Sequence, residues 1–124
     1  MMSETISKKE QMKNKIQYSP IAMRDLDGIW DYITNELLNP SAAEDTVNGI
    51  MDVINGLEDF PEIGNRLIFD TGLDSGYRFV IYKNYMTFYH IQADFIYIDR
   101  VMYGKRDYMT ELFPDNFAFD ISNE

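Results

Sequence analysis

Three runs of apolar and aromatic residues follow one another almost without interruption in the second half of the chain. They span residues 77–82, 85–91 and 95–103, and each is rich in the Ile, Val, Tyr and Phe that favour strands. The breaks between consecutive runs are very short, with Lys83-Asn84 in the first and Ala93-Asp94 in the second. Such breaks suit tight hairpin turns, where Asn and Asp tolerate unusual backbone angles. The runs therefore predict an antiparallel meander.

A first helix is predicted ahead of the meander, from Ser19-Pro20 to near Leu38. Serine caps the exposed amides of a helix start, and proline is favoured at the first helical position. Apolar residues then recur at helical spacing and predict a buried stripe, with Trp30 in the core. The stripe consists of Ala22, Leu26, Ile29, Trp30, Ile33 and Leu37.

A second helix is predicted to end at Phe60-Pro61, and its start has two interpretations. Asn39-Pro40 can begin it as Ser19-Pro20 begins the first, or Ser41 and Glu44 can form a capping box. Its apolar stripe consists of Ala43, Val47, Ile50, Met51, Ile54 and Leu57. Gly49 and Gly56 each cost about 1 kcal/mol relative to alanine in a helix interior, and close approach of a neighbouring element is one compensation. This helix is therefore predicted to pack tightly on another element.

Two further short strands complete the expected order, one at residues 15–18 and one at residues 66–70. The connection between the helices is short, so the two helices form an antiparallel hairpin. We predict an α+β fold: an N-terminal strand and a helical hairpin packed on one face of a small, mostly antiparallel sheet. The other face is expected to be exposed and to carry aromatic and basic side chains.

The chain is expected to form one domain at residues 15–113, between a polar flexible extension at residues 1–14 and an acidic tail at residues 114–124. It has no cysteine, and its acids have no metal-binding spacing, so neither a metal nor a cofactor is expected. The single histidine, His90, is expected to be a partly buried sheet residue rather than a general base. Since neither a signal sequence nor a membrane-length apolar run is evident, we expect a soluble cytoplasmic protein.

The formal net charge of −10 opposes indiscriminate binding to nucleic acid. The charge is uneven, because residues 19–60 hold nine acids and one base, whereas residues 61–113 hold seven acids and six bases. A solvated helix face is the plainer interpretation of the acids. A local positive patch on the second half of the chain stays compatible with this distribution.

Several short motifs occur in a defined order along the chain. They are Asn39-Pro40-Ser41-Ala42-Ala43 at the second helix, Leu57-Glu58-Asp59-Phe60-Pro61-Glu62-Ile63-Gly64 after it, Ser75-Gly76-Tyr77-Arg78 before the meander and Gly104-Lys105-Arg106 after it. Together with the order of elements, they resemble the RelE/ParE superfamily, the toxins (also called plasmid stabilisation proteins) of type II toxin–antitoxin systems. The eight-residue motif is similar to the Leu-x-x-Phe-Pro-x-x-Gly pattern of ParE-like members. The resemblance covers roughly residues 16–113 and implies the fold predicted above.

The resemblance implies one of two toxin chemistries. RelE-like members are ribosome-dependent mRNA endonucleases (mRNA interferases), and Arg78 and Arg106 fall on positions that are catalytic in them. Guanidinium groups suit this role because they bind phosphate oxygens bidentately. The chain departs from that pattern elsewhere: the paired lysines align near Phe69 and Thr71, and the C-terminal tyrosine aligns near Leu112, with Tyr108 out of step.

ParE-like members poison DNA gyrase without a catalytic set, and the Phe-Pro-x-x-Gly loop favours this branch. Residues that would contact the target or nucleic acid are Arg78, Lys83, Arg100, Lys105, Arg106 and Tyr108. The alternative for Arg78 is an ion pair with a carboxylate, either on the surface or within the sheet. The expected partner is a cognate antitoxin that covers the sheet edge and the hairpin, and a basic antitoxin segment would suit the acidic helices. Homodimers, hetero-oligomers with the antitoxin and a non-toxic binding module of the same fold are compatible with the sequence.

Overall fold

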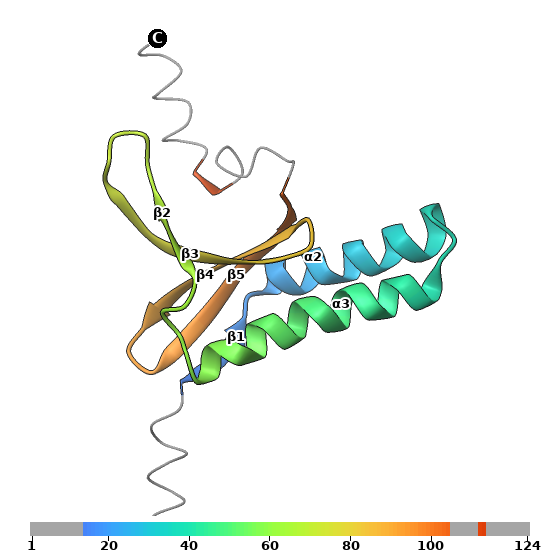
Figure 1. Cartoon of the computed structure of the whole chain (residues 1–124), viewed down its shortest axis with the longest axis horizontal. Helices are drawn as coiled ribbons and strands as arrows, with labels where there is room; N and C mark the ends of the chain where they lie inside the picture. The colour runs from blue at the N-terminus through green and yellow to red at the C-terminus, as the bar shows by residue number, and fades with distance from the viewer. Residues whose placement is uncertain (1–13, 105–111, 114–124) are drawn as a thin grey trace, which may run out of the picture.

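The computed structural model of the chain describes residues 14–104 and 112–113 and contains a five-stranded sheet beside a helical hairpin (Figure 1). The sheet order is β1-β5-β4-β3-β2, with β1 parallel to β5 and the other neighbours antiparallel. This arrangement confirms the predicted α+β class. The elements are β1 (Lys15–Tyr18), α2 (Pro20–Asp31), α3 (Pro40–Asn55), β2 (Asn65–Ile68), β3 (Asp74–Tyr82), β4 (Tyr85–Gln92) and β5 (Phe95–Tyr103).

Helix α2 begins where the sequence predicts. The Ser19 hydroxyl accepts a hydrogen bond from the Ala22 amide at 2.9 Å, and Pro20 occupies the first helical position. The end of the helix differs from a regular α-helix, because residues Tyr32–Glu36 form a π-helical turn. The chain then leaves the helix at Leu38, which has a φ of 52°. The first helix of the hairpin therefore ends near Leu38, as predicted, but its last turn is π-helical and so wider than an α-helical turn.

The exposure of Trp30 corrects the prediction that it belongs to the core. Trp30 is 38% exposed and Leu37 is 57% exposed, whereas Leu26 and Ile33 are buried. Ile29 takes the inward position between Leu26 and Ile33 and packs against the core. Trp30 follows it by one residue, which is about 100° further round the helix, and so lies at the margin of the stripe.

Helix α3 selects one of the two predicted starts. The Asn39 side chain accepts from the Ala42 amide at 3.2 Å, and Pro40 follows as the first helical residue. The predicted tight packing is confirmed at Gly49, where an added Cβ would lie 2.1 Å from the Tyr82 ring. No neighbour lies within 4 Å of the corresponding point at Gly56. A short 3₁₀ turn at Gly56–Glu58 ends the hairpin.

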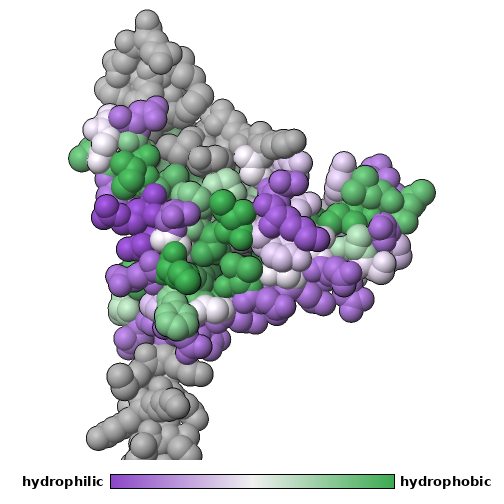
Figure 2. Space-filling model, viewed as in Figure 1, coloured by the Kyte–Doolittle hydropathy of each residue, from purple (hydrophilic) through white to green (hydrophobic). Residues whose placement is uncertain are grey.

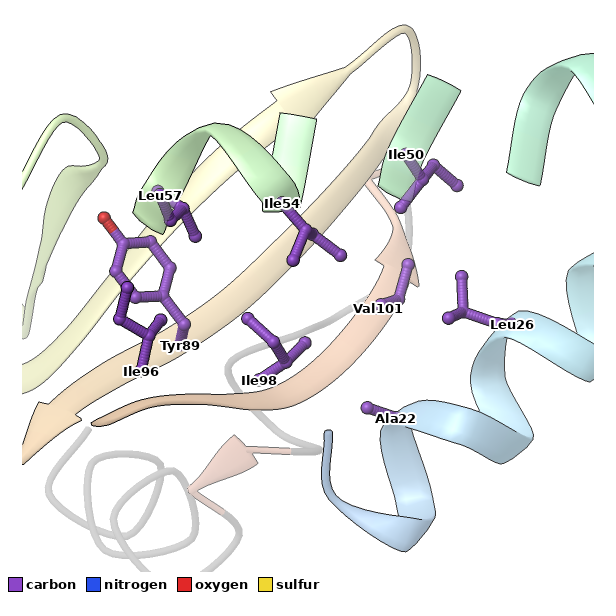
Figure 3. Close-up of a cluster of buried hydrophobic side chains, with 9 residues drawn as sticks. All are labelled: Ala22, Leu26, Ile50, Ile54, Leu57, Tyr89, Ile96, Ile98 and Val101. Atoms are coloured by element: carbon purple, nitrogen blue, oxygen red, sulfur yellow. The ribbon is translucent and has the colours of Figure 1, made fainter. Parts of the chain in front are cut away.

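The main core lies between the helical hairpin and one face of the sheet (Figure 3). Ile50 and Ile54 of α3, with Leu57 of the 3₁₀ turn, face the sheet, and Ala22 and Leu26 of α2 complete the helical side. The sheet supplies Tyr89, Ile96, Ile98 and Val101. Because strand side chains alternate between faces, this set defines the helix-facing side of β4 and β5.

The opposite face of the sheet is not left exposed, which corrects the expectation that it would be. Leu67, Met86, Phe88 and Met102 form a second buried cluster there. Leu112 and Phe113 return from beyond β5 to pack on it, and the Phe113 ring lies 4.9 Å from the Phe69 ring. Too many large apolar side chains alternate along these strands for one layer of helices to bury. The fold therefore has cores on both sides of its sheet.

Both predicted hairpin turns are present, at Lys83-Asn84 and Ala93-Asp94. The left-handed backbone conformation falls on Lys83, with a φ of 53°, and on Ala93, with a φ of 55°. The Asn and Asp that mark these turns in the sequence are thus not the residues with positive φ. Strand β2 is shorter than predicted and ends at Ile68 rather than residue 70. No helix in the described part of the chain is long and apolar enough to cross a membrane.

Candidate functional site

Arg78 lies on β3 and reaches the loop that follows the helical hairpin. Its guanidinium donates to the Glu62 carbonyl at 3.1 Å and to the Gly64 carbonyl at 2.9 Å. Backbone carbonyls carry only partial charge, so this contact differs from the ion pair considered as its alternative role. Arg78 therefore fastens the Phe-Pro-x-x-Gly loop to the sheet with one Nη atom.

Tyr89 holds the same loop from inside the core. Its hydroxyl donates to the Pro61 carbonyl at 2.7 Å and accepts from the Gly64 amide at 3.0 Å. Burial raises the pKa of Tyr89, and the bond from Gly64 and the nearby Arg78 only partly offset that effect. Gly64 fits because an added Cβ would lie 2.5 Å from the Tyr89 hydroxyl oxygen. The loop motif is thus recognisable in the sequence, whereas its anchor Tyr89 is separated from it by a whole hairpin.

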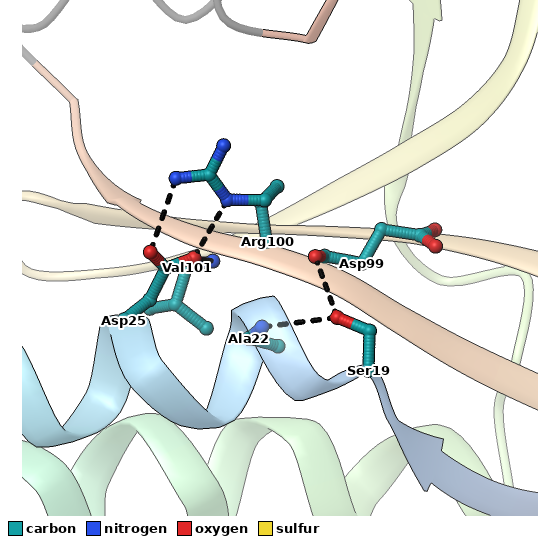
Figure 4. A network of polar contacts seen from close by, with 6 residues as sticks. All are labelled: Ser19, Ala22, Asp25, Asp99, Arg100 and Val101. Atoms are coloured by element: carbon teal, nitrogen blue, oxygen red, sulfur yellow. Dashed lines mark hydrogen bonds and ion pairs between the residues drawn. The ribbon is translucent and has the colours of Figure 1, made fainter.

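Arg100 lies on β5 and pairs with Asp25 of α2 (Figure 4). Its Nε donates to Asp25 at 2.8 Å and its Nη2 at 3.1 Å, a two-point contact between largely buried side chains. The same carboxylate accepts the Val101 amide at 2.9 Å. Ser19 adds a second link by donating its hydroxyl to the Asp99 carbonyl at 2.9 Å. Strand β1 pairs with β5 only as far as Ile98, so these side chains continue the bonding along the strand edge.

The structure does not bring Arg78 and Arg100 together. Arg78 pairs with Tyr89 across β3 and β4, while Arg100 pairs with Phe88 across β5 and β4. Because Phe88 and Tyr89 are consecutive, the two arginines stand on opposite faces of the sheet. Lys83 is at the β3–β4 turn, and its Nζ lies 5.5 Å from the centre of the Tyr82 ring. Lys105, Arg106 and Tyr108 are outside the described residues.

A cluster around His90, which sequence reasoning did not single out as a site, lies on the face away from the helices. His90 Nδ1 is 2.6 Å from an Asp99 carboxylate oxygen, and its ring stacks on Tyr97 at 5.0 Å between centroids. Burial raises the pKa of Asp99, while the contact with His90 acts in the opposite direction. The register of β4 and β5 shifts next to Tyr89, and this irregularity brings Asp99 toward His90. His90 is partly buried in the sheet, as predicted.

A groove of about 710 Å³ runs between the end of α2 and the adjoining ends of β4 and β5. Its walls combine apolar and aromatic side chains, including Ile29, Tyr32, Leu37, Tyr85 and Tyr103. Tyr32 is 54% exposed and Leu37 is 57% exposed, so the groove presents apolar surface that this chain leaves uncovered among its described residues. Such a surface is suited to a partner protein rather than to solvent.

The described part of the chain contains no group of three or more His, Asp or Glu side chains placed to hold a metal ion. The expectation that the protein works without metal or cofactor stays a prediction. What the geometry offers is a rigid loop clamp, a cross-linked strand edge and an apolar groove.

The helical hairpin on a five-stranded sheet and the Phe-Pro loop agree with the resemblance to the toxins of type II toxin–antitoxin systems, and comparison with known families establishes the class. The family described as "ParE toxin of type II toxin-antitoxin system, parDE" matches residues 16–108. The chain belongs to this ParE toxin family, within the RelE/ParE superfamily. No match is found among curated proteins.

Solved structures show the same fold. A chain of the chromosomal ParDE system from P. aeruginosa superposes with a TM-score of 0.61 at 20% identity, covering 73% of this chain and 95% of that one. A chain of the RelBE2 toxin–antitoxin complex from Mycobacterium tuberculosis gives a TM-score of 0.50 at 18% identity, covering 73% and 98%. At these identities the similarity concerns the fold, and it spans nearly the whole of both relatives.

Proposed function

We propose that this ParE-family toxin poisons DNA gyrase when free and is neutralised by a cognate antitoxin. The match to the ParE toxin family over residues 16–108 is the observation that carries the proposal. The position of Arg78 supports it, since one Nη of its guanidinium already bonds the carbonyls of Glu62 and Gly64 and so serves the loop. A gyrase poison acts by contact and needs no catalytic set of its own.

The surroundings of Phe69 further support gyrase over messenger RNA as the target. Phe69 stands near the position of one catalytic lysine in RelE-like toxins, and its ring packs against Phe113. An aromatic side chain used in packing cannot stabilise a phosphate that gains charge in a transition state. The net charge of −10 also opposes entry into an anionic ribosome.

The groove between α2 and the ends of β4 and β5 is the proposed antitoxin site. Leu37 and Tyr32 expose apolar surface there, which an antitoxin segment would bury. Nine of the ten charged side chains at residues 19–60 are acidic, so a segment with Lys or Arg beside its apolar residues fits best. Both solved relatives come from toxin–antitoxin systems, which is consistent with a protein partner.

Inducible expression of the full chain tests the proposal. Growth arrest is expected, with DNA double-strand breaks and a DNA-damage response before any fall in protein synthesis. With purified gyrase and supercoiled plasmid, the protein should raise the yield of linear DNA in a cleavage assay. Harmless expression at high level would contradict a toxin. Early arrest of translation with cleavage within translated messages would replace gyrase by messenger RNA as the target.

A pair of adjacent leucines tests the antitoxin site. Leu37 lines the groove, whereas Leu38 does not line it although it is 81% exposed. Leu37→Asp should weaken binding to the protein encoded by the adjoining antitoxin gene, and Leu38→Asp should leave it nearly unchanged. Titration calorimetry measures both. Equal affinity for the two variants would place the antitoxin elsewhere on the surface.

A further inference from the structure

Three of the side chains that line the groove between α2 and the ends of β4 and β5 are tyrosines, namely Tyr32, Tyr85 and Tyr103. Tyr85 and Tyr103 are direct partners across β4 and β5, and their rings meet edge to face with 5.6 Å between centroids. Tyr32 comes from the opposite wall, at the end of α2, and is 54% exposed. We call these three residues the tyrosine cage. Aromatic side chains thus stand on both walls of the groove.

The electrostatics of Tyr85 agree with this convergence. Burial raises the pKa of Tyr85, and the neighbouring Tyr103 and Tyr32 raise that pKa further. An effect of one tyrosine on the charge of another requires that the two lie close together. The structure therefore gathers the three rings around one part of the groove.

The π-helical turn at the end of α2 places Tyr32 on its wall of the groove together with Leu37. The Leu37 amide donates to the Tyr32 carbonyl at 3.3 Å, which is the five-residue spacing of a π-helix. In a regular α-helix, residues five apart lie about 140° from one another around the axis. The wider turn brings them nearer, and both line the groove. Figure 2 shows hydrophobic surface at the tip of the hairpin, where this turn leads to α3.

No described cation of this chain occupies the tyrosine cage. Arg24 supplies the positive charge among the described residues that line the groove, but it lies about 12 Å from Tyr32 along the helix axis, at about 1.5 Å per residue. The cation–π contact of the described part of the chain is made elsewhere, by Lys83 on Tyr82. Gly28, one turn before Tyr32, lines the groove without a side chain, and an added Cβ there would meet no atom within 4 Å. The approach to the cage along α2 is therefore open.

The chemistry of the cage suits a guanidinium group. The faces of tyrosine rings carry negative electrostatic potential and attract cations. A guanidinium is planar and more weakly hydrated than an ammonium, so it stacks on aromatic rings at a lower cost of desolvation. Asp31 and Glu36, next to and within the π-helical turn, are exposed and form no ion pair with another described residue. Their negative charge adds to the attraction.

We propose that the tyrosine cage binds the guanidinium of an arginine in the antitoxin segment that occupies the groove. This inference rests on the proposed antitoxin site and names the side chain that the site recognises. Leu37 and Ile29 contact the apolar residues of the segment, while the cage fixes the position of its arginine. A segment with a neutral or acidic residue at that position loses the cation–π contact and binds more weakly.

A matched pair of small molecules tests the cage without the antitoxin. N-acetyl-arginine amide carries the guanidinium, and N-acetyl-citrulline amide is its neutral counterpart of nearly the same shape. Each is titrated into the full chain with isotope-labelled tyrosine rings and followed by NMR. The arginine compound should shift the ring signals of Tyr32, Tyr85 and Tyr103 and bind about three- to tenfold more tightly than the citrulline compound. Equal affinity, or ring signals that do not move, would overturn the proposal.

Variants of Tyr32 test the cage with the protein encoded by the adjoining antitoxin gene. Tyr32→Leu keeps apolar surface but removes the ring, whereas Tyr32→Phe keeps the ring and removes the hydroxyl. By titration calorimetry, the dissociation constant should rise about three- to tenfold for Tyr32→Leu and stay within about twofold for Tyr32→Phe. Phe60→Leu is the matched control, because Phe60 is an exposed aromatic residue outside this groove.

The outcomes separate the cage from the proposed antitoxin site. If Leu37→Asp weakens antitoxin binding and Tyr32→Leu does not, the groove is the antitoxin site and the proposal for the cage is wrong. It is also wrong if Tyr32→Phe weakens binding as much as Tyr32→Leu, because the hydroxyl and not the ring then makes the contact. If neither Leu37→Asp nor Tyr32→Leu affects binding, the antitoxin lies elsewhere and both proposals are overturned.

Discussion

At the scale of single residues, Asp25 links a helix to the edge of the sheet through three hydrogen bonds. It accepts two hydrogen bonds from Arg100 and one from the Val101 amide, and so joins α2 to β5 beyond the end of β1. Its side chain is 15% exposed and that of Arg100 is 21% exposed. With so little water nearby, the loss of either partner leaves the other poorly solvated.

We expect Asp25→Ala to lower the free energy of unfolding by about 2–3 kcal/mol, because it leaves the Arg100 charge and the Val101 amide without this acceptor. Asp25→Asn should cost less, since an amide oxygen still accepts from Val101. Urea unfolding at neutral pH measures both. Asp27→Ala, on the exposed side of the same helix, is the control and should stay within about 0.5 kcal/mol of the parent. An Asp25→Ala variant as stable as that control would contradict the assigned role.

The Tyr89 hydroxyl provides a second prediction at this scale. Tyr89→Phe keeps the ring in the core but removes the partner of the Gly64 amide and the Pro61 carbonyl. We expect a loss of about 1–3 kcal/mol, the usual cost of leaving a buried polar group unsatisfied. Tyr97→Phe is the control, because its hydroxyl makes no hydrogen bond among the described residues. Equal urea midpoints for the two variants would show that the hydroxyl does not hold the loop.

The roles of Arg78 and Arg100 show what sequence reasoning misses at this scale. The sequence predicts that both arginines contact the target, yet Arg78 bonds backbone carbonyls and Arg100 bonds a helix carboxylate. Their partners lie far away in the sequence, so composition and spacing could not supply them. A strand pattern fixes which residues alternate, whereas the face that each residue occupies depends on the register across strands.

At the scale of elements, the contact of α3 with β3 depends on Gly49. An added Cβ at Gly49 would lie 2.1 Å from the Tyr82 ring, and Tyr82 packs against the main core. We expect Gly49→Ala to destabilise the fold by about 1–2 kcal/mol, because displacement of the ring outweighs the gain of about 1 kcal/mol in helix propensity. Gly28→Ala in α2 meets no atom within 4 Å and should stabilise the fold instead.

A double-mutant cycle separates the clash from helix propensity. Once Tyr82→Ala has removed the ring, Gly49→Ala should become neutral or stabilising, because only the propensity term is left. Thermal unfolding of the four proteins in the cycle measures the coupling. Additive effects of the two changes would mean that α3 does not press on Tyr82.

The elements themselves could largely be read from the sequence. Ser19 and Asn39 cap the two helices as their position before proline predicts, and the meander strands begin within a few residues of their predicted bounds. The misses have a common physical origin in tertiary packing. Ile29, and not Trp30, occupies the inward position on α2. Phe113 packs on the sheet face away from the helices, for which the sequence predicts no cover. Neither outcome follows from local periodicity.

At the scale of the whole molecule, buried tyrosines make stability sensitive to high pH. Burial raises the pKa of Tyr18, Tyr77, Tyr85 and Tyr89 above that of free tyrosine. Above a pH of about 10, the unfolded chain releases protons that the folded chain retains, so folding becomes less favourable as pH rises. The stabilising contribution is complete below that pH and is lost as pH rises through the folded pKa values. Tyr89 is fully buried, so we expect it to make the largest contribution to this loss of stability at high pH.

We expect the urea midpoint to fall increasingly as the pH is raised above about 10, with each such tyrosine adding at most about 1.4 kcal/mol per pH unit. The Tyr89→Phe variant should show a shallower fall than the parent, although it is less stable at neutral pH. The net negative charge also grows over this range because basic groups lose their protons, and added salt separates the two causes because it screens exposed charges and not burial. If parent and variant decline in parallel at high salt, the proton on Tyr89 is not linked to folding, and the remaining alkaline instability comes from the other buried tyrosines.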